Sequence, residues 1–292
     1  MTLTGLFVAL ATPFTPAGDV DQPAYRRLVR HVAGGGAHLV VLGTTGEAPT
    51  ILDDERDALV DITLEEAGSA TVIVGTGSNA TRQAAAWTRR AQAQGAHGAL
   101  VVTPYYNKPT PEGIRAHFEA VAEAAPGLPL VVYNVPGRTG LNLTPQALAR
   151  LWENPQVAAV KESSGNLAQI AEIARTLPEG KALLAGDDNL AVASIAVGAS
   201  GLVSVLGNVL PRETARLVKL ALDGRRAEAI ALHQQLLPLM DALFLESNPI
   251  PLKAALELLG LCGPTLRLPL VPAAPATRAR LAELLPRRGE VA

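Results

Sequence analysis

A lysine at the end of an apolar run is the residue with the clearest chemical potential. The chain has five lysines, and Lys161 directly continues the run Val157–Val160. Burial and nearby positive charge lower the pKa of a lysine ammonium group, and the neutral amine attacks carbonyl carbon atoms. Lys161 therefore indicates Schiff-base chemistry, although an ion pair with the adjacent Glu162 is an alternative that position alone leaves open.

Three of the four tyrosines stand where other apolar runs end. Tyr105 and Tyr106 follow the run Ala99–Val102, and Tyr133 ends the run Leu130–Tyr133. A phenol can pass a proton and can hold a carbonyl or carbinolamine oxygen. Schiff-base formation needs such transfers, because water must leave and a carbon-bound proton must be removed. Aromatic packing at the rim is the alternative, and it suits Tyr105 better than Tyr133.

Groups suited to carboxylates lie in two further segments. Thr44 and Thr45 stand between glycines, where hydroxyl and backbone N–H groups can turn toward a ligand carboxylate. Arg138 lies in a Pro-Gly-Arg-Thr-Gly loop, and its forked cation suits a second carboxylate. Structural roles stay open for all three, since the threonines could cap the next helix and Arg138 could be a surface residue.

These residues need a scaffold that gathers the ends of apolar runs. Eight such runs recur, most of them apolar throughout rather than alternating, which is typical of parallel strands buried on both faces. They are Leu6–Leu10, Leu39–Leu42, Thr71–Val74, Ala99–Val102, Leu130–Tyr133, Val157–Val160, Ala182–Leu184 and Gly201–Val205. Eight strand–helix units in about 220 residues predict an α/β fold, a closed (β/α)₈ TIM barrel with its chemistry at the carboxyl ends of the strands.

Helix-like segments separate the runs and continue beyond them. Those inside the barrel include Asp53–Ala67, Ala80–Gln94, Pro111–Ala125 and Pro145–Leu151. Asp53 and Thr144 suit N-caps. Beyond about Asp223 only helices are expected, at Arg225–Phe244, Pro251–Leu259 and Ala276–Leu285. We predict a catalytic barrel over residues 1–224 and a C-terminal helical region over residues 225–292, which serves packing and assembly.

Composition and charge exclude several classes of protein. Hydrophobic residues are 48% and charged residues 18% of the chain, which suits a sizeable core. The net charge of −2 indicates neither nucleic acid nor an anionic membrane as partner. No stretch reaches transmembrane length, the N-terminus reads poorly as a signal peptide, and the single Cys262 permits no intrachain disulfide. We therefore expect a cytoplasmic protein.

Three weaker motifs have simpler interpretations. Gly75-Thr-Gly-Ser-Asn-Ala80 loosely matches the phosphate loop of a doubly wound nucleotide-binding sheet, but the next strand carries no acidic residue for a ribose. Asp53-Asp-Glu-Arg-Asp57 has the spacing of a magnesium motif, yet it also opens a helix, where acidic residues favour the dipole. Asp187 and Asp188 suggest a metal, but the five histidines show no ligand spacing. We expect neither a cofactor nor a metal.

In combination, the motifs resemble the dihydrodipicolinate synthase family of pyruvate-dependent lyases and aldolases. The resemblance covers almost the whole chain, in order and with matching spacing. Each motif alone is modest, and together they are specific. The segments that carry it are Gly43–Glu47, Thr103–Asn107, Tyr133–Gly140, Lys161–Glu162, Gly186–Asp188 and Asn248–Lys253.

The resemblance implies a reaction between pyruvate and L-aspartate 4-semialdehyde. Lys161 would form an imine with pyruvate, and Arg138 would hold the semialdehyde carboxylate. The proton relay would consist of Thr44, Tyr133 and Tyr106, with Tyr106 reaching in from a neighbouring subunit. Thr45, Gly186 and Val203 would bind pyruvate. The family also implies a homo-oligomer, usually a tetramer built as a dimer of dimers.

Two other functions stay open. N-acetylneuraminate lyases, keto-deoxy sugar-acid aldolases and hydroxy-oxoglutarate aldolases share the barrel, the lysine and the tyrosine, but Arg138 in its Asn-Val-Pro-Gly-Arg-Thr-Gly segment favours the synthase. A catalytically inactive barrel that only binds a small acid is the second alternative. Such a protein would be expected to lose Lys161 or Tyr133, and both are present.

Overall fold

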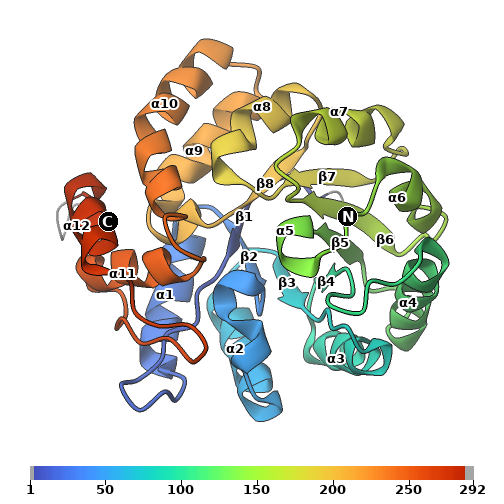
Figure 1. The fold of residues 1–292 in the computed structure, drawn as a ribbon, viewed down its shortest axis with the longest axis horizontal. Coiled ribbons are helices and arrows are strands. Elements are labelled where there is room, and N and C mark those ends of the chain that lie inside the picture. Colours follow the sequence, from blue (N-terminus) through green and yellow to red (C-terminus); the bar gives the residue numbers. More distant parts are fainter. Residues whose placement is uncertain (1–2, 287–292) are drawn as a thin grey trace. The chain divides into compact units, whose positions relative to one another are not determined.

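The strands form a closed parallel barrel in the order β1 to β8 (Figure 1). The computed structural model describes residues 3–286. The strand bounds are β1 Gly5–Ala9, β2 His38–Val41, β3 Val72–Gly75, β4 Gly98–Val102, β5 Leu130–Asn134, β6 Val157–Glu162, β7 Ala182–Ala185 and β8 Gly201–Ser204. Each predicted apolar run contains or overlaps one of these strands, so the predicted (β/α)₈ fold is confirmed. Strand β6 extends two residues further than its apolar run and includes Lys161.

The helices follow the predicted segments closely. Their bounds are α1 Gln22–Gly34, α2 Asp53–Glu66, α3 Thr81–Gln94, α4 Pro111–Ala124, α5 Pro136–Thr139, α6 Pro145–Leu151, α7 Leu167–Thr176, α8 Ala191–Ala196, α9 Pro211–Leu222, α10 Arg226–Ala242, α11 Ile250–Leu259 and α12 Pro275–Leu284. The last three are the C-terminal helices, and residues 287–292 of the predicted C-terminal region lie outside the described residues.

One predicted cap is confirmed and one is wrong. The Thr144 hydroxyl accepts a hydrogen bond from Ala147 N at 3.2 Å and begins α6 as expected. Asp53, in contrast, is the first residue inside α2, and Leu52 is the N-cap. The Glu55 carboxylate accepts a hydrogen bond from Leu52 N at 2.9 Å. A side chain inside the helix thus satisfies the backbone N–H of the N-cap residue.

The chain forms two compact units. The first contains β3 to β7, most of β8, and the helices between them. The second contains most of β1, then α1, β2 and α2, and after β8 the helices α9 to α12. The C-terminal helices therefore share a unit with the segment that follows β2.

In the first unit the parallel register places β6 between β5 and β7. Tyr133 of β5 pairs with Lys161 of β6, and Lys161 pairs in turn with Leu184 of β7. Both sides of the β6 backbone are hydrogen-bonded, so its side chains can only alternate between the two faces of the sheet. The direction of each side chain at the end of β6 is therefore fixed by the register.

The loop that resembled a phosphate site is a tight turn against the next strand. A Cβ added at Gly77 would lie 2.4 Å from Val102 N and 2.7 Å from Val102 Cγ1. The glycine is thus required by close packing on β4, which agrees with the simpler interpretation of this motif.

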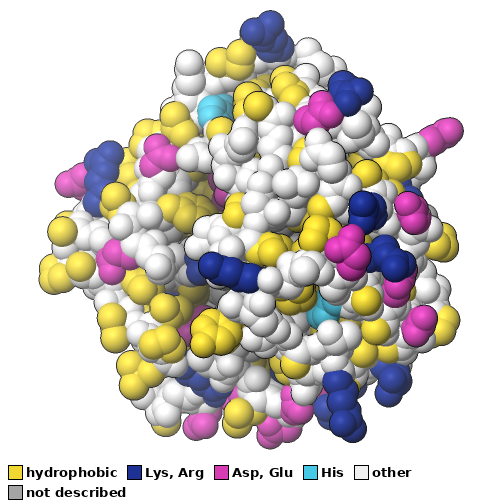
Figure 2. All heavy atoms as spheres, turned by 45° about the vertical axis from the view of Figure 1, so that its right-hand side comes forward, with side chains coloured by type: hydrophobic (Ala, Val, Ile, Leu, Met, Phe, Trp, Pro, Cys, Tyr) yellow, Lys and Arg dark blue, Asp and Glu magenta, His cyan; other side chains and the backbone are white. Residues whose placement is uncertain are grey.

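Charged side chains of both signs are interspersed on the face that Figure 2 shows. The ion pairs of the structure include ones within a single helix, such as Arg115–Glu119 and Arg175–Glu172. Within residues 3–286 no helix is long and apolar enough to cross a membrane.

Candidate active site

Lys161 and Tyr133 meet on one face of the sheet. The two residues are register partners on neighbouring strands, and the Lys161 ammonium nitrogen lies 4.1 Å from the centroid of the Tyr133 ring. Each residue is only 6% exposed. An amine and a phenol thus share a sheltered position at the carboxyl ends of β5 and β6, as the sequence predicted. Such a pair can attack a carbonyl carbon and exchange protons with the oxygen of the adduct.

The residues that follow them meet on the opposite face. Asn134 Nδ2 donates to both Glu162 carboxylate oxygens, at 3.2 and 2.9 Å, and both residues are fully buried. Gln169 of α7 donates to Glu162 Oε1 at 3.3 Å, and Ser164 N donates to the same oxygen at 2.9 Å. Because Glu162 contacts α7, its face is the helix side, and Lys161 faces the barrel interior. The alternative of a Lys161–Glu162 ion pair at the rim is therefore wrong.

Gly186 directly follows β7 and lies beside the end of β6. Its N–H donates to Glu162 O at 2.8 Å. A Cβ at this position would fall 1.7 Å from Ser163 Oγ, so only glycine fits beside the end of β6. In the parallel register the Ala185–Leu202 pair is followed by Gly186 and Val203, and Val203 is buried in β8. Gly186 thus directly follows Ala185 of β7, whose register partner Leu202 directly precedes Val203 in β8.

Asp187 is an acidic group within electrostatic range of Lys161. Burial raises the pKa of its carboxyl from 3.8 to about 6, while the positive charge of Lys161 and a backbone hydrogen bond from Gly165 act in the opposite direction. A carboxyl with such a pKa changes its charge close to neutral pH. Sequence reasoning considered Asp187 only as a metal ligand, and within the described chain no group of three or more His, Cys, Asp or Glu residues is placed to hold a metal ion.

A backbone hydrogen bond connects the segments that carry Arg138 and Tyr106. Arg138 was predicted in a loop and instead lies on the short helix α5, because Pro136 starts a turn in which Arg138 N donates to Val135 O at 2.9 Å. Tyr106 N donates to Thr139 O at 3.4 Å, which connects the loop after β4 to the end of α5. Tyr106 has a φ of 73° and is 88% exposed. A non-glycine residue in the left-handed region is uncommon and is held there by its surroundings.

Thr44 and Thr45 belong to the second unit. They start a short 3₁₀ helix, η1 (Thr44–Gly46), directly after Gly43. Thr45 is buried, and its hydroxyl oxygen accepts a hydrogen bond from Asn248 Nδ2 at 2.9 Å. The threonines thus lie in a 3₁₀ turn, and α2 is capped without them at Leu52.

Comparison with known proteins identifies the family. The model of the dihydrodipicolinate synthetase family matches residues 2–287. The chain belongs to this family. It is 49% identical over 281 residues to the 4-hydroxy-tetrahydrodipicolinate synthase of Thermomicrobium roseum, covering 96% of this chain and 92% of the relative. It is 45% identical over 282 residues to the corresponding synthase of a Cyanothece strain, covering 96% of each.

Solved structures of the dihydrodipicolinate synthetase family agree with this fold. The crystal structure of dihydrodipicolinate synthase from Thermotoga maritima has a TM-score of 0.94 at 40% identity and covers 97% of this chain and 98% of its own. A second structure, described as the first monomeric dihydrodipicolinate synthase variant, has a TM-score of 0.94 at 41% identity and covers 97% and 95%. The resemblance predicted from the motifs is confirmed.

Sequence reasoning missed the buried hydrogen bonds that Glu162, the residue after Lys161, accepts from Asn134 and Gln169. Asn134 directly follows Tyr133, and Glu162 directly follows Lys161, so each strand ends in a predicted site residue and then a polar one. A polar side chain at the end of a strand buried on both faces needs a hydrogen-bonding partner. That repeated pattern is the signal that could have paired Asn134 with Glu162.

Replacement of Asp187 by Asn should change the pH dependence of stability. Because the folded-state pKa is above the unfolded value, the folded protein binds more protons between pH 4 and 6, and stability falls as pH rises through this range. Each pKa unit is worth about 1.4 kcal/mol, so Asp187→Asn should be more stable by up to about 3 kcal/mol at pH 8. This advantage should vanish near pH 4.

The measurement is urea unfolding of both proteins at pH 4 and pH 8. Asp223→Asn, at an exposed position at the end of α9, is the matched control and should change stability little at either pH. Equal stability of wild type and Asp187→Asn at pH 8 would show that the half-buried carboxyl carries no such penalty.

Proposed function

We propose that the chain condenses pyruvate with L-aspartate 4-semialdehyde through a Schiff base at Lys161, giving 4-hydroxy-tetrahydrodipicolinate. The observation that carries the proposal is the sheltered contact between the Lys161 amine and the Tyr133 phenol ring at the ends of two register-paired strands. The family membership supports it, since the curated relatives described above are named 4-hydroxy-tetrahydrodipicolinate synthases.

The first half of the reaction activates pyruvate. The Lys161 amine attacks C2 of pyruvate to give a carbinolamine, which loses its oxygen as water and leaves a protonated imine. The imine withdraws electrons, so a proton can leave the C3 methyl group and an enamine forms. In this proposal Thr44, Tyr133 and Tyr106 move the protons. The Thr45 hydroxyl donates a hydrogen bond to the pyruvate carboxylate, and Gly186 and Val203 shape the space beside it.

The second half forms the carbon–carbon bond and releases the enzyme. C3 of the enamine attacks the aldehyde carbon of the semialdehyde, and the aldehyde oxygen takes up a proton to become a hydroxyl. The amino group of the bound substrate then attacks C2, and the bond from C2 to Lys161 breaks as the ring closes. Arg138 binds the semialdehyde carboxylate through two parallel N–H groups of its guanidinium and so orients this substrate toward the enamine.

We also propose an assembly and a location. Tyr106 is 88% exposed, although a proton relay requires shelter from water. In this proposal Tyr106 therefore reaches into the active site of a second copy of the chain, which covers it. A homotetramer arranged as a dimer of dimers provides such a contact in the family. One of the solved structures is described as a monomeric variant, so the oligomeric state of this chain should be measured. The proposed substrates are metabolites of the cell interior, which supports a cytoplasmic enzyme.

Substrate preference separates the synthase from the related sugar-acid aldolases. The purified enzyme should condense pyruvate with L-aspartate 4-semialdehyde and should not cleave N-acetylneuraminate or keto-deoxy sugar acids at a comparable rate. Arg138→Leu should raise the KM for the semialdehyde at least tenfold and leave the KM for pyruvate within about twofold, because one charge-assisted pair contributes about 1.5–3 kcal/mol. Faster cleavage of a sugar acid than condensation would assign the chain to the alternative.

Tyr106→Phe should lose most of its condensation activity and still bind pyruvate covalently. The phenol is removed from the relay, while Lys161 and Tyr133 are untouched, so kcat should fall by 10²-fold or more. Tyr105→Phe is the matched control, and it should retain activity because Tyr105 is expected to pack at the rim. Steady-state kinetics and analytical ultracentrifugation of both variants test this, and an unimpaired Tyr106→Phe enzyme removes the residue from the relay.

A further inference from the structure

A side chain from the C-terminal helical region sets the hydrogen bonding of Thr45. Asn248, two residues before α11, donates from Nδ2 to Thr45 Oγ1 at 2.9 Å, and both residues are buried. They are 203 positions apart in the chain. A hydroxyl oxygen that accepts an amide hydrogen keeps its own hydrogen for another acceptor. Asn248 thus leaves the Thr45 hydroxyl as a hydrogen-bond donor.

A buried ion pair holds the next part of the same segment, which we call the β2 loop (residues 43–50). Glu47 has a φ of 54°, in the left-handed region, and its carboxylate lies 2.8 Å from the ammonium nitrogen of Lys253 on α11. The two side chains are 1% and 0% exposed. The backbone N–H of Arg267 donates to the other Glu47 oxygen at 3.1 Å. A buried carboxylate persists only with such partners, so they restrict where Glu47 can lie.

Lys253 is itself held from three directions. Besides Glu47, its ammonium group donates to Thr265 O at 2.7 Å and lies 3.9 Å from the centroid of the Phe14 ring. A fully buried ammonium with these partners has little freedom to move. The anchor of the β2 loop is therefore rigid.

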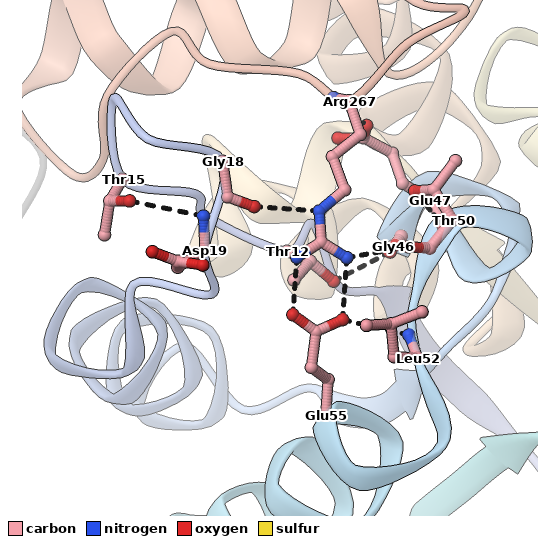
Figure 3. Close-up of polar contacts among 10 residues, drawn as sticks. All are labelled: Thr12, Thr15, Gly18, Asp19, Gly46, Glu47, Thr50, Leu52, Glu55 and Arg267. Carbon is pink, nitrogen blue, oxygen red and sulfur yellow. Dashed lines mark hydrogen bonds and ion pairs between the residues drawn. The ribbon is translucent and has the colours of Figure 1, made fainter.

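The Arg267 side chain secures the far end of the β2 loop (Figure 3). Its Nη1 donates to Thr50 O and to Glu55 Oε2, each at 2.7 Å, and Nη2 donates to the other Glu55 oxygen. Its Nε donates to Gly18 O at 2.8 Å. Glu55 is the residue that caps α2 through Leu52 N. One guanidinium thus joins the end of the β2 loop to the first turn of α2.

We propose that Asn248, Lys253 and Arg267 are positioning residues that hold the β2 loop for binding of a substrate carboxylate, with Asn248 keeping the Thr45 hydroxyl as donor. The inference rests on the proposed function, which assigns Thr45 to the carboxylate of pyruvate. The C-terminal region then has a part in substrate binding besides the packing and assembly expected from the sequence.

The direct test is the Asn248–Thr45 hydrogen bond. Asn248→Leu keeps the same branching and number of side-chain heavy atoms and lacks the donor, so the KM for pyruvate should rise about tenfold while kcat stays within about threefold. Asn248→Asp should raise the KM further, because a carboxylate only accepts hydrogen bonds and repels the carboxylate of pyruvate. In a Thr45→Val background, Asn248→Leu should add less than twofold, since its partner is already absent.

The ion-pair side of the proposal has a matched control in the same region. Arg267→Met removes the bonds to Thr50, Glu55 and Gly18 and should raise the KM for pyruvate at least threefold. Arg278→Met removes the ion pair between Arg278 of α12 and Glu257 of α11, which does not involve the β2 loop, and should leave this KM unchanged. An equal effect of Arg278→Met would mean general loosening of the C-terminal helices and would overturn the proposal.

Failure of this inference is distinguishable from failure of the proposed function. If wild type condenses the two substrates but Asn248→Leu keeps its KM, or if its effect multiplies fully with that of Thr45→Val, the positioning role is wrong. If wild type forms no reducible adduct with pyruvate, the proposed function is wrong instead. Circular dichroism of each variant verifies folding, and should Asn248→Leu fail to fold, Arg267→Met and Arg278→Met decide the question.

Discussion

The hydrogen-bonded pairing of β6 with a strand on each side is the constraint on which the site depends. With both edges of its backbone engaged, β6 can direct Lys161 to one face only, and the register with β5 places Tyr133 beside it. A flexible loop would give the amine many positions and its full hydration. The strand gives it one direction and leaves only 6% of the residue exposed, which suits the nucleophile proposed for the reaction.

The same alternation of side chains places residues on the helix side of the sheet, where buried polar groups need hydrogen-bonding partners. Each strand that presents a reactive residue inward presents its neighbour outward, and here the outward neighbours are Asn134 and Glu162. Burial of a carboxylate is costly unless several donors surround it, and Asn134, Ser164 and Gln169 supply them. The second unit repeats this solution, with Glu47 buried against Lys253 and Arg267. Buried carboxylates with dedicated partners thus lie one residue after Lys161 and two residues after Thr45.

Local patterns in the sequence were sufficient for the elements and for much of the site. Apolar runs located all eight strands, and Lys161 and Tyr133 were identified because each ends such a run. The structure adds the parallel register, in which Tyr133 of β5 pairs with Lys161 of β6. Local prediction was wrong at the start of α2, where Glu55 rather than Asp53 supplies the capping bond, and at Arg138, which lies on α5 rather than in a loop.

Contacts between distant segments were beyond the sequence. No periodicity relates Asn248 to Thr45 or Lys253 to Glu47, because these contacts depend on how α11 packs after more than 200 intervening residues. The raised pKa of Asp187 could not be predicted from the sequence for a similar reason, since burial depends on all the elements around a residue. The residues that support a site from a distance are therefore the ones that require the structure.

The central claim is that the amine of Lys161 forms the covalent bond to pyruvate. The most direct measurement is mass spectrometry of the intact and digested protein after borohydride reduction in the presence of pyruvate, on wild type and Lys161→Ala. The account predicts one reduced pyruvyl group on wild type, located at Lys161, and none on the variant. An unmodified wild-type protein, or an adduct located at a different side chain, would contradict it.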